Sequence, residues 1–297
     1  SRAPVGDKAA VPSPLPNLLP LITFPAALLP VFAGALLPST VLGMPAPRDG
    51  GAVLYEPPPD PGPNPACPAD MRLVTGVHYD EMERLCLQEK AHRCWSYVPH
   101  ATVTQGERRD VRVCMDQFEA PNERGAKPFV MKDFGQAQRW CSERGKRLCS
   151  EEEFETACEG VDLRPYFYGF AVDPSICNAS KPWLAFDAKA LDAGGEKASK
   201  EVSRLWQGSN SGEYERCRTR DGIYDLIGNV EEWVTSRKGR RWPGALMGGF
   251  WAKPWVGCRG TNDAHRPTFA FYEVGWRCCA DPTDRPAGGV ASGAASR

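Results

Sequence analysis

Residues 222–279 constrain the fold more than any other part of this chain. Apolar residues alternate there with small and acidic residues in bursts that are too short for an amphipathic helix. The glycines favour tight turns, and the tryptophans are large flat side chains that need neighbours to pack against. The stretch therefore predicts an irregular core that is built mostly from loops.

Twelve cysteines indicate disulfides and an oxidising compartment. Their number is even, and no two of them have the Cys-x-x-Cys spacing of many zinc and redox sites. We therefore expect disulfides in preference to a zinc or iron–sulfur centre, and an exported protein that is periplasmic, at the cell surface or secreted. A formal net charge of -1 gives no electrostatic reason to expect nucleic acid as a partner.

The beginning of the chain differs in composition from the rest. Residues 1–47 form a hydrophobic leader, in which residues 18–42 are nearly uncharged and follow Arg2 and Lys8. This layout predicts an export or membrane-anchoring segment, which would make the membrane a partner. Its prolines would interrupt a spanning helix, so a disordered leader rich in proline and alanine is the alternative.

The remaining boundaries follow from prolines and cysteines. Residues 48–66 are rich in proline and predict a semi-rigid linker. Residues 67–114 predict a Cys-rich N-terminal subdomain, residues 115–281 the main domain, and residues 282–297 a disordered tail. Hydrophobic residues make up 42% of the chain, which is enough for a core.

The Cys-rich segment also holds three histidines. They lack the i, i+4 spacing of a helical metal site, so we expect exposed or incidental histidines in preference to metal ligands at His78, His92 and His100. Its cysteines predict two local disulfides, but three pairings are open for Cys67, Cys86, Cys94 and Cys114.

Two short helices are predicted in the main domain. Asp133 is a suitable N-cap with Gln136 three residues later, and this helix should stop at Gly145. Ser150 and Glu153 form a second capping-box pattern with further acids in the first turn. The apolar face of that second helix should carry Phe154, Ala157 and Cys158 into the core.

Several blocks resemble a known family. G-x-Y-D-x-x-G-N-V-x-E-W begins at Gly222, G-G-x-W begins at Gly248 and G-W-R-C begins at Gly275. With L-x-[ST]-E-x-E around residues 148–153, they are similar to motifs of the formylglycine-generating, or sulfatase-modifying factor, family. The resemblance implies an α+β fold: one duplicated, C-type-lectin-like domain, poor in regular secondary structure. Cys149 stands where the family usually has proline, which suggests an additional disulfide.

The resemblance implies a structural calcium ion. The family's side-chain ligands correspond here to Asp225 and Glu232, and its main-chain carbonyl ligands to Gly228 and Val230. A further ligand segment of the family corresponds to the segment that contains Asn178. Calcium prefers several oxygen ligands, and two carboxylates at one turn suit it. The alternative is that Asp225 and Glu232 are ordinary capping or paired carboxylates.

The resemblance also implies disulfide pairs. It pairs Cys141 with Cys278 and Cys158 with Cys258. Successive strand side chains point to opposite faces, so Cys278 and Cys279 should not share a partner. The remaining cysteines of the domain then form the pairs Cys149 with Cys279 and Cys177 with Cys217.

The catalytic residues of the family are incomplete. The generating enzyme holds copper(I) between two cysteines spaced C-x4-C after the G-G-x-[WY] turn, because this soft ion needs thiolates. Here Cys258 has Lys253 five residues before it, so copper is not expected. The His-x3-His-x-Glu helix of an iron-binding branch does not occur either.

Three functions are compatible with these residues. The first is a binding or scaffold domain for an unknown protein or peptide, without the copper-dependent oxidase. The second is an oxidase of a protein cysteine or small thiol, and the third a generating enzyme in which Cys258 works with a distant cysteine. A cleft lined by Trp251, Trp255 and His265 would favour the second, and a filled cleft the first. The candidate residues for the second are Trp251, Trp255, Asp263, His265 and Arg266.

Overall fold

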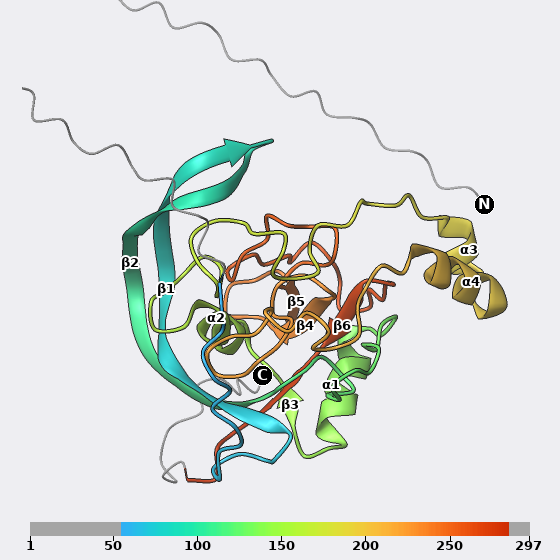
Figure 1. The fold of residues 1–297 in the computed structure, drawn as a ribbon. Helices are drawn as coiled ribbons and strands as arrows, with labels where there is room; N and C mark the ends of the chain where they lie inside the picture. Colours follow the sequence, from blue (N-terminus) through green and yellow to red (C-terminus); the bar gives the residue numbers. More distant parts are fainter. Residues whose placement is uncertain (1–54, 285–297) are drawn as a thin grey trace, which may run out of the picture. The chain divides into compact units, whose positions relative to one another are not determined.

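The structure, a computed structural model, describes residues 55–284 (Figure 1). These residues all fall within one compact unit. The predicted leader at residues 1–47, part of the linker and most of the predicted tail lie outside the described residues. Among the residues that are described, no helix is both long and apolar enough to cross a membrane.

The fold is α+β with short elements and long loops, as predicted. One sheet has the strand order β1-β2-β7-β3 and the other has the order β5-β4-β6. The strands are β1 (Met71–Lys90), β2 (Arg93–Asp116), β3 (Arg147–Leu148), β4 (Glu231–Thr235), β5 (Gly244–Met247), β6 (Val274–Trp276) and β7 (Cys278–Ala280). The helices are α1 (Phe134–Ser142), α2 (Glu151–Glu159), α3 (Ala188–Asp192) and α4 (Gly195–Leu205).

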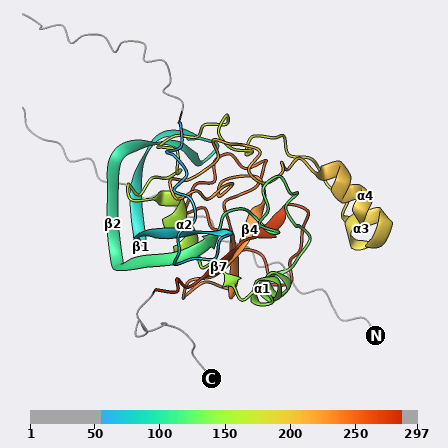
Figure 2. The same ribbon diagram turned by 60° about the horizontal axis from the view of Figure 1, so that its bottom comes forward.

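The segment predicted as a Cys-rich subdomain is a long hairpin that belongs to the main sheet. Strands β1 and β2 pair along their length, and β2 continues into the sheet where Cys114 lies opposite Ala280. Figures 1 and 2 both show β1 between β2 and α2. The hairpin therefore wraps one side of α2 and does not stand apart as a separate subdomain.

Both predicted helices begin at their predicted caps. The Asp133 side chain accepts a hydrogen bond from the Gln136 backbone, and Ser150 accepts one from Glu153. Each capping box is closed by the return bond from the Gln or Glu side chain. The first helix ends at Ser142, slightly before the predicted stop, and Gly145 takes a positive φ of 68° in the turn that follows.

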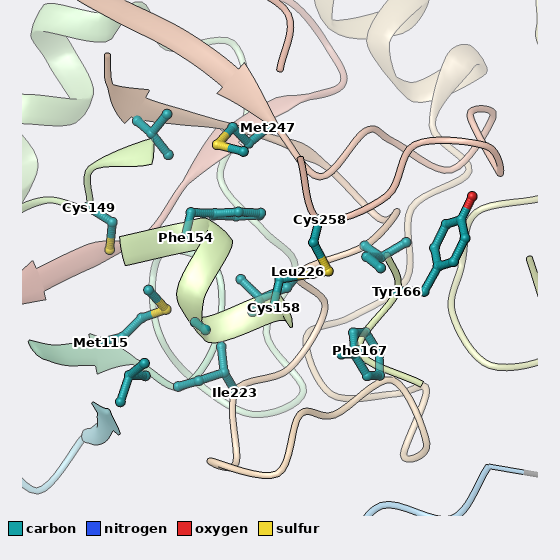
Figure 3. Close-up of a cluster of buried hydrophobic side chains, with 14 of the residues drawn as sticks. Met115, Cys149, Phe154, Cys158, Tyr166, Phe167, Ile223, Leu226, Met247 and Cys258 are labelled. Carbon is teal, nitrogen blue, oxygen red and sulfur yellow. A yellow bond between two sulfur atoms is a disulfide. The ribbon is translucent and has the colours of Figure 1, made fainter. Parts of the chain in front are cut away.

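The main core lies around α2. Phe154 and Cys158 of this helix pack with Leu226, Met247 and other buried side chains (Figure 3). Truncating a fully buried side chain such as Phe154 to alanine typically costs about 3–5 kcal/mol. The loops of residues 222–279 are thus held in place by apolar packing on α2.

Six disulfides tie the loops together. Four of them match the pairs expected for the main domain, namely Cys141–Cys278, Cys149–Cys279, Cys158–Cys258 and Cys177–Cys217. The structure also settles the pairing that the sequence left open, as Cys67–Cys114 and Cys86–Cys94. Cys67–Cys114 closes the base of the hairpin and Cys86–Cys94 closes its tip.

Candidate functional site

A tight turn organises the motif at residues 222–233. Gly228 has φ of 79°, and a Cβ there would lie 2.4 Å from the Asn178 carbonyl oxygen. Asn229 follows it with its side chain buried, where its Oδ1 accepts a bond from the Ser209 amide at 2.8 Å. Its Nδ2 donates to Glu119 at 2.8 Å. Glycine is needed because the backbone of residue 178 passes so close to this turn.

Beneath this turn lies a buried charge centre, which we define as Glu119, Asp225, Glu232 and Arg277. The guanidinium of Arg277 donates to both Glu232 oxygens, at 2.6 and 2.7 Å. Asp225 accepts a bond from the Gly212 amide at 2.8 Å. All four residues are at most 1% exposed. Three carboxyl groups thus face one guanidinium in the interior.

Burial makes ionisation of these carboxyl groups unfavourable. It raises the pKa of Asp225 to about 7. It also raises the pKa of Glu119 well above its ordinary value, and the charges of Asp225 and Glu232 add to that rise. The pKa of Glu232 is raised by burial too, although Arg277 opposes the rise. Without an added cation, the centre therefore favours holding protons.

The expected calcium ligands fit such an ion only in part. Asp225 Oδ1 and Asn178 Oδ1 are buried and lack hydrogen-bond partners, so both oxygens suit a hard cation. Both oxygens of Glu232 are instead engaged by Arg277. Within residues 55–284, no group of three or more His, Cys, Asp or Glu side chains is arranged to hold a metal. The observed fit therefore rests on the free oxygens of Asp225 and Asn178, and both Glu232 oxygens are occupied by Arg277.

The two positions expected to hold copper in the family have other partners here. Cys258 is bonded to Cys158, and Figure 3 shows this pair between α2 and the segment that follows the G-G-x-W turn. The Lys253 ammonium lies 2.9 Å from a carboxylate oxygen of Glu231 and 4.9 Å from the centre of the Phe250 ring. All twelve cysteines lie among the described residues and none of them is free.

The aromatic cleft that would have favoured an oxidase is not found among the described residues. Trp251 is 1% exposed and packs against Trp206 and Tyr272 in the core. His265 stacks on Phe269 with ring centres 3.8 Å apart, and burial lowers its pKa. Arg266 lies over the ring of Trp242. Trp251 is thus enclosed by other rings, whereas Trp255 lines a different cleft, and this arrangement favours the first of the three functions over the second.

A different cleft is present, which we call the groove. It has a volume of about 640 Å³ and lies between the hairpin tip and residues 255–264. Of the earlier candidates, only Trp255 and Asp263 line it. The sequence reasoning missed its other main side chains, which are Arg84, Arg93, Tyr97, Glu231, Lys253, Arg259 and Thr261.

Two arginines of the groove, Arg84 and Arg259, are anchored on the acidic face of α2. Glu151, Glu155 and Glu159 recur every four residues, and all three are buried. Glu159 accepts bonds from Arg84 at 2.6 Å and from Arg259 at 2.7 Å. The four-residue spacing was the available signal, because it places three carboxylates on one helix face that needs cations if buried.

His78 belongs to the same network. Its Nε2 lies 2.7 Å from a Glu155 oxygen, and its side chain is fully buried. The prediction of exposed or incidental histidines therefore fails for His78, because the hairpin lays it against α2. His92 is fully exposed, with Glu89 3.6 Å away.

Comparison with known proteins identifies relatives of the described domain. A family model for the sulfatase-modifying factor enzyme 1-like domain matches residues 72–282. The inactive C-alpha-formylglycine-generating enzyme 2 of Bos taurus is 32% identical over 111 residues, which are 37% of this chain and 33% of that protein. The chain thus matches about a third of the length of this curated relative. The family match includes the hairpin of β1 and β2 as well as the predicted main domain.

Two solved structures are similar at low identity. PvdO from Pseudomonas aeruginosa is 16% identical with a TM-score of 0.42, and the match covers 70% of this chain and 94% of that one. CarF is 14% identical with a TM-score of 0.46, and the match covers 73% of this chain and 99% of that one.

Proposed function

This chain belongs to the family of sulfatase-modifying factor enzyme 1-like domains, and we propose that it is an exported binding domain that lacks copper-dependent oxidase activity. Its binding surface is the groove, and its partner is a protein or peptide. Six disulfides support an oxidising, exported environment.

One observation carries the loss of oxidase activity. Copper(I) needs soft thiolate ligands, and the family mechanism uses two of them. Here the sulfur of Cys258 is bonded to Cys158, and Lys253 pairs with Glu231 at the position of the second ligand. An ammonium group has no affinity for copper(I) and would repel it. The same pairing counts against an enzyme in which Cys258 works with a distant cysteine, because none of the twelve cysteines is free.

The alternative oxidase at the aromatic residues has little support. Its candidates Trp251, His265 and Arg266 pack on other rings and do not converge on one open space. A binding role is compatible with the groove, which is open and large enough for a few side chains of a peptide. Its walls come from the hairpin tip and from a segment that Cys158–Cys258 ties down, so the shape is largely preformed.

We also propose a structural calcium ion held by Asp225 and Asn178, with the carbonyls of Gly228 and Val230. Two buried oxygens without partners support it. An ion there would supply positive charge next to the buried charge centre and would fix the turn at residues 225–230.

The proposed absence of oxidase activity is tested by assaying aldehyde formation on a Cys-x-Pro-x-Arg peptide, with copper, reductant and oxygen supplied. We expect no turnover, and the Cys258→Ala variant should behave like the wild-type chain. Turnover that disappears in Cys258→Ala would overturn the proposal, because it would show that Cys258 acts as a thiolate.

The binding role is tested by selecting displayed random peptides on the immobilised chain. Ala264 is exposed and lines the groove, so Ala264→Trp should fill it and abolish binding of the selected peptides. Ser199→Trp places the same side chain at an exposed position of α4 and should leave binding unchanged. Failure to select any peptide, or equal binding by both variants, would count against the groove.

A further inference from the structure

We propose that the groove is an oxyanion site for an acidic peptide, in which Arg84, Arg93 and Thr261 bind a ligand carboxylate. This inference rests on the proposed binding function and adds the chemical class of the ligand.

Cations outnumber anions on the groove wall. Its charged side chains are four cations and two anions, with His92 in addition, namely Arg84, Arg93, Lys253 and Arg259 against Glu231 and Asp263. Both anions have partners, because Glu231 is paired with Lys253 and Asp263 lies 3.8 Å from Arg240. The open charge of the groove is therefore positive.

The arginines of the groove have fewer carboxylate partners than they have positive charges. Arg84 and Arg259 both pair with Glu159, and the next carboxylate, Glu155, is 3.6 Å from Arg259 and also serves Arg237 and His78. Arg93 is exposed and makes no ion pair among the described residues. A ligand carboxylate would balance a charge that the chain itself does not neutralise.

Unused hydrogen-bond groups lie in the same wall. The Arg84 side chain is only 10% exposed, and its Nε is buried without a partner. Thr261 Oγ1 is also buried and unpartnered. A buried donor without a partner is unfavourable, so a ligand oxygen that accepts a hydrogen bond from it would gain affinity. Charge-assisted bonds from guanidinium to carboxylate are among the stronger hydrogen bonds.

The remaining wall suits a peptide backbone and its apolar parts. Tyr97 and Trp255 line the groove beside the charged groups. The same wall should repel a peptide that carries arginine, such as the Cys-x-Pro-x-Arg peptide of the aldehyde assay. The groove therefore favours a ligand of negative charge.

The test uses the full chain and three labelled peptides that alternate serine with glutamate, glutamine or lysine. We expect fluorescence anisotropy to show binding of the glutamate peptide only, and weaker binding as salt is raised. Arg93→Glu should weaken this binding about tenfold or more, since a charge-assisted bond is lost and a like charge is added. Thr261→Val should weaken it about threefold.

Arg108→Glu is the matched control. Arg108 is an exposed hairpin arginine that pairs with Asp110 and does not line the groove, so this variant should bind as the wild-type chain does. Equal loss in Arg93→Glu and Arg108→Glu would overturn the site, because it would show a non-specific charge effect. Preference for the glutamine or lysine peptide would also overturn it.

A fourth peptide, with phosphoserine in place of glutamate, separates the sources of the oxyanion. Tighter binding of this peptide, lost in Arg93→Glu, would overturn the assignment to carboxylates. The two proposals fail differently. Selected peptides that are lost in Ala264→Trp but carry no acidic residues would overturn the oxyanion site alone, whereas aldehyde formation would overturn the proposed loss of oxidase activity.

Discussion

The buried charge centre and the groove differ in both the sign of their excess charge and their access to water. The centre is closed, and its three carboxyl groups lie near one fully buried guanidinium, that of Arg277. The groove is open, and its cations outnumber its anions. Desolvation dominates in the first and raises the pKa values of its acids, whereas water screens much of the charge in the second. The same kinds of side chain thus stabilise the fold in one region and remain available to a ligand in the other.

The largest expected effect is in the buried charge centre. Arg277→Met removes the guanidinium that pairs with both oxygens of Glu232, so the free energy of unfolding in urea should fall by about 3–5 kcal/mol. Adding Glu232→Gln to this variant should recover part of the loss, because the buried charge without a partner is then gone. A loss below about 1 kcal/mol in Arg277→Met would show that the pair is not enclosed as described.

Calcium should have the next largest effect. An ion that binds only the native state raises stability by RT ln(1 + [L]/Kd), or a few kcal/mol at saturation. The melting temperature should therefore be higher in calcium than in chelator, and Asp225→Asn should remove most of the difference. Identical melting temperatures in the two conditions, with no metal retained on purification, would exclude the ion.

The pH dependence of the metal-free protein tests the same centre. The pKa of Asp225 is about 7 in the folded chain, compared with an ordinary value of 3.8. Between these values the native state holds a proton that the unfolded chain has released, so stability is lost as pH rises toward the folded pKa. Unfolding between about pH 5 and about pH 7 should show this decline, because most exposed carboxyl groups are already ionised there.

Asp225→Asn is the control for this decline, and it should flatten the slope. The burial-raised pKa of Glu273, also about 7, contributes a slope of the same sign and should remain in that variant. Stability that rises with pH over the same interval would contradict the assignment of a buried protonated Asp225.

The smallest expected effect is in the groove. Arg93 is exposed and makes no ion pair among the described residues, so Arg93→Glu should change the free energy of unfolding by less than about 0.5 kcal/mol. Its effect on binding of the glutamate peptide should nevertheless be large. A destabilisation comparable to that of Arg277→Met would remove the distinction between the two regions.

Local chemistry was readable from the sequence. The Asp133 and Ser150 capping boxes depend on residues three positions apart, so their side-chain bonds follow from the sequence itself. The motifs from Gly222 to Cys278 identified the family, and the family in turn implied the pairs Cys141–Cys278 and Cys158–Cys258. Elimination left Cys149–Cys279 and Cys177–Cys217, and the structure contains all four. The lack of a second cysteine five residues before Cys258 was equally plain.

Only the tertiary structure decided which charges meet. Arg84 and Arg259 are far apart in sequence, and they converge on Glu159 because the hairpin wraps α2 and a disulfide holds residue 258 against the same helix. The pairing of Glu232 with Arg277 likewise depends on β4 lying beside β6, just before Arg277. Ion pairs form wherever packing brings long side chains together, and sequence spacing carries no record of such non-local contacts.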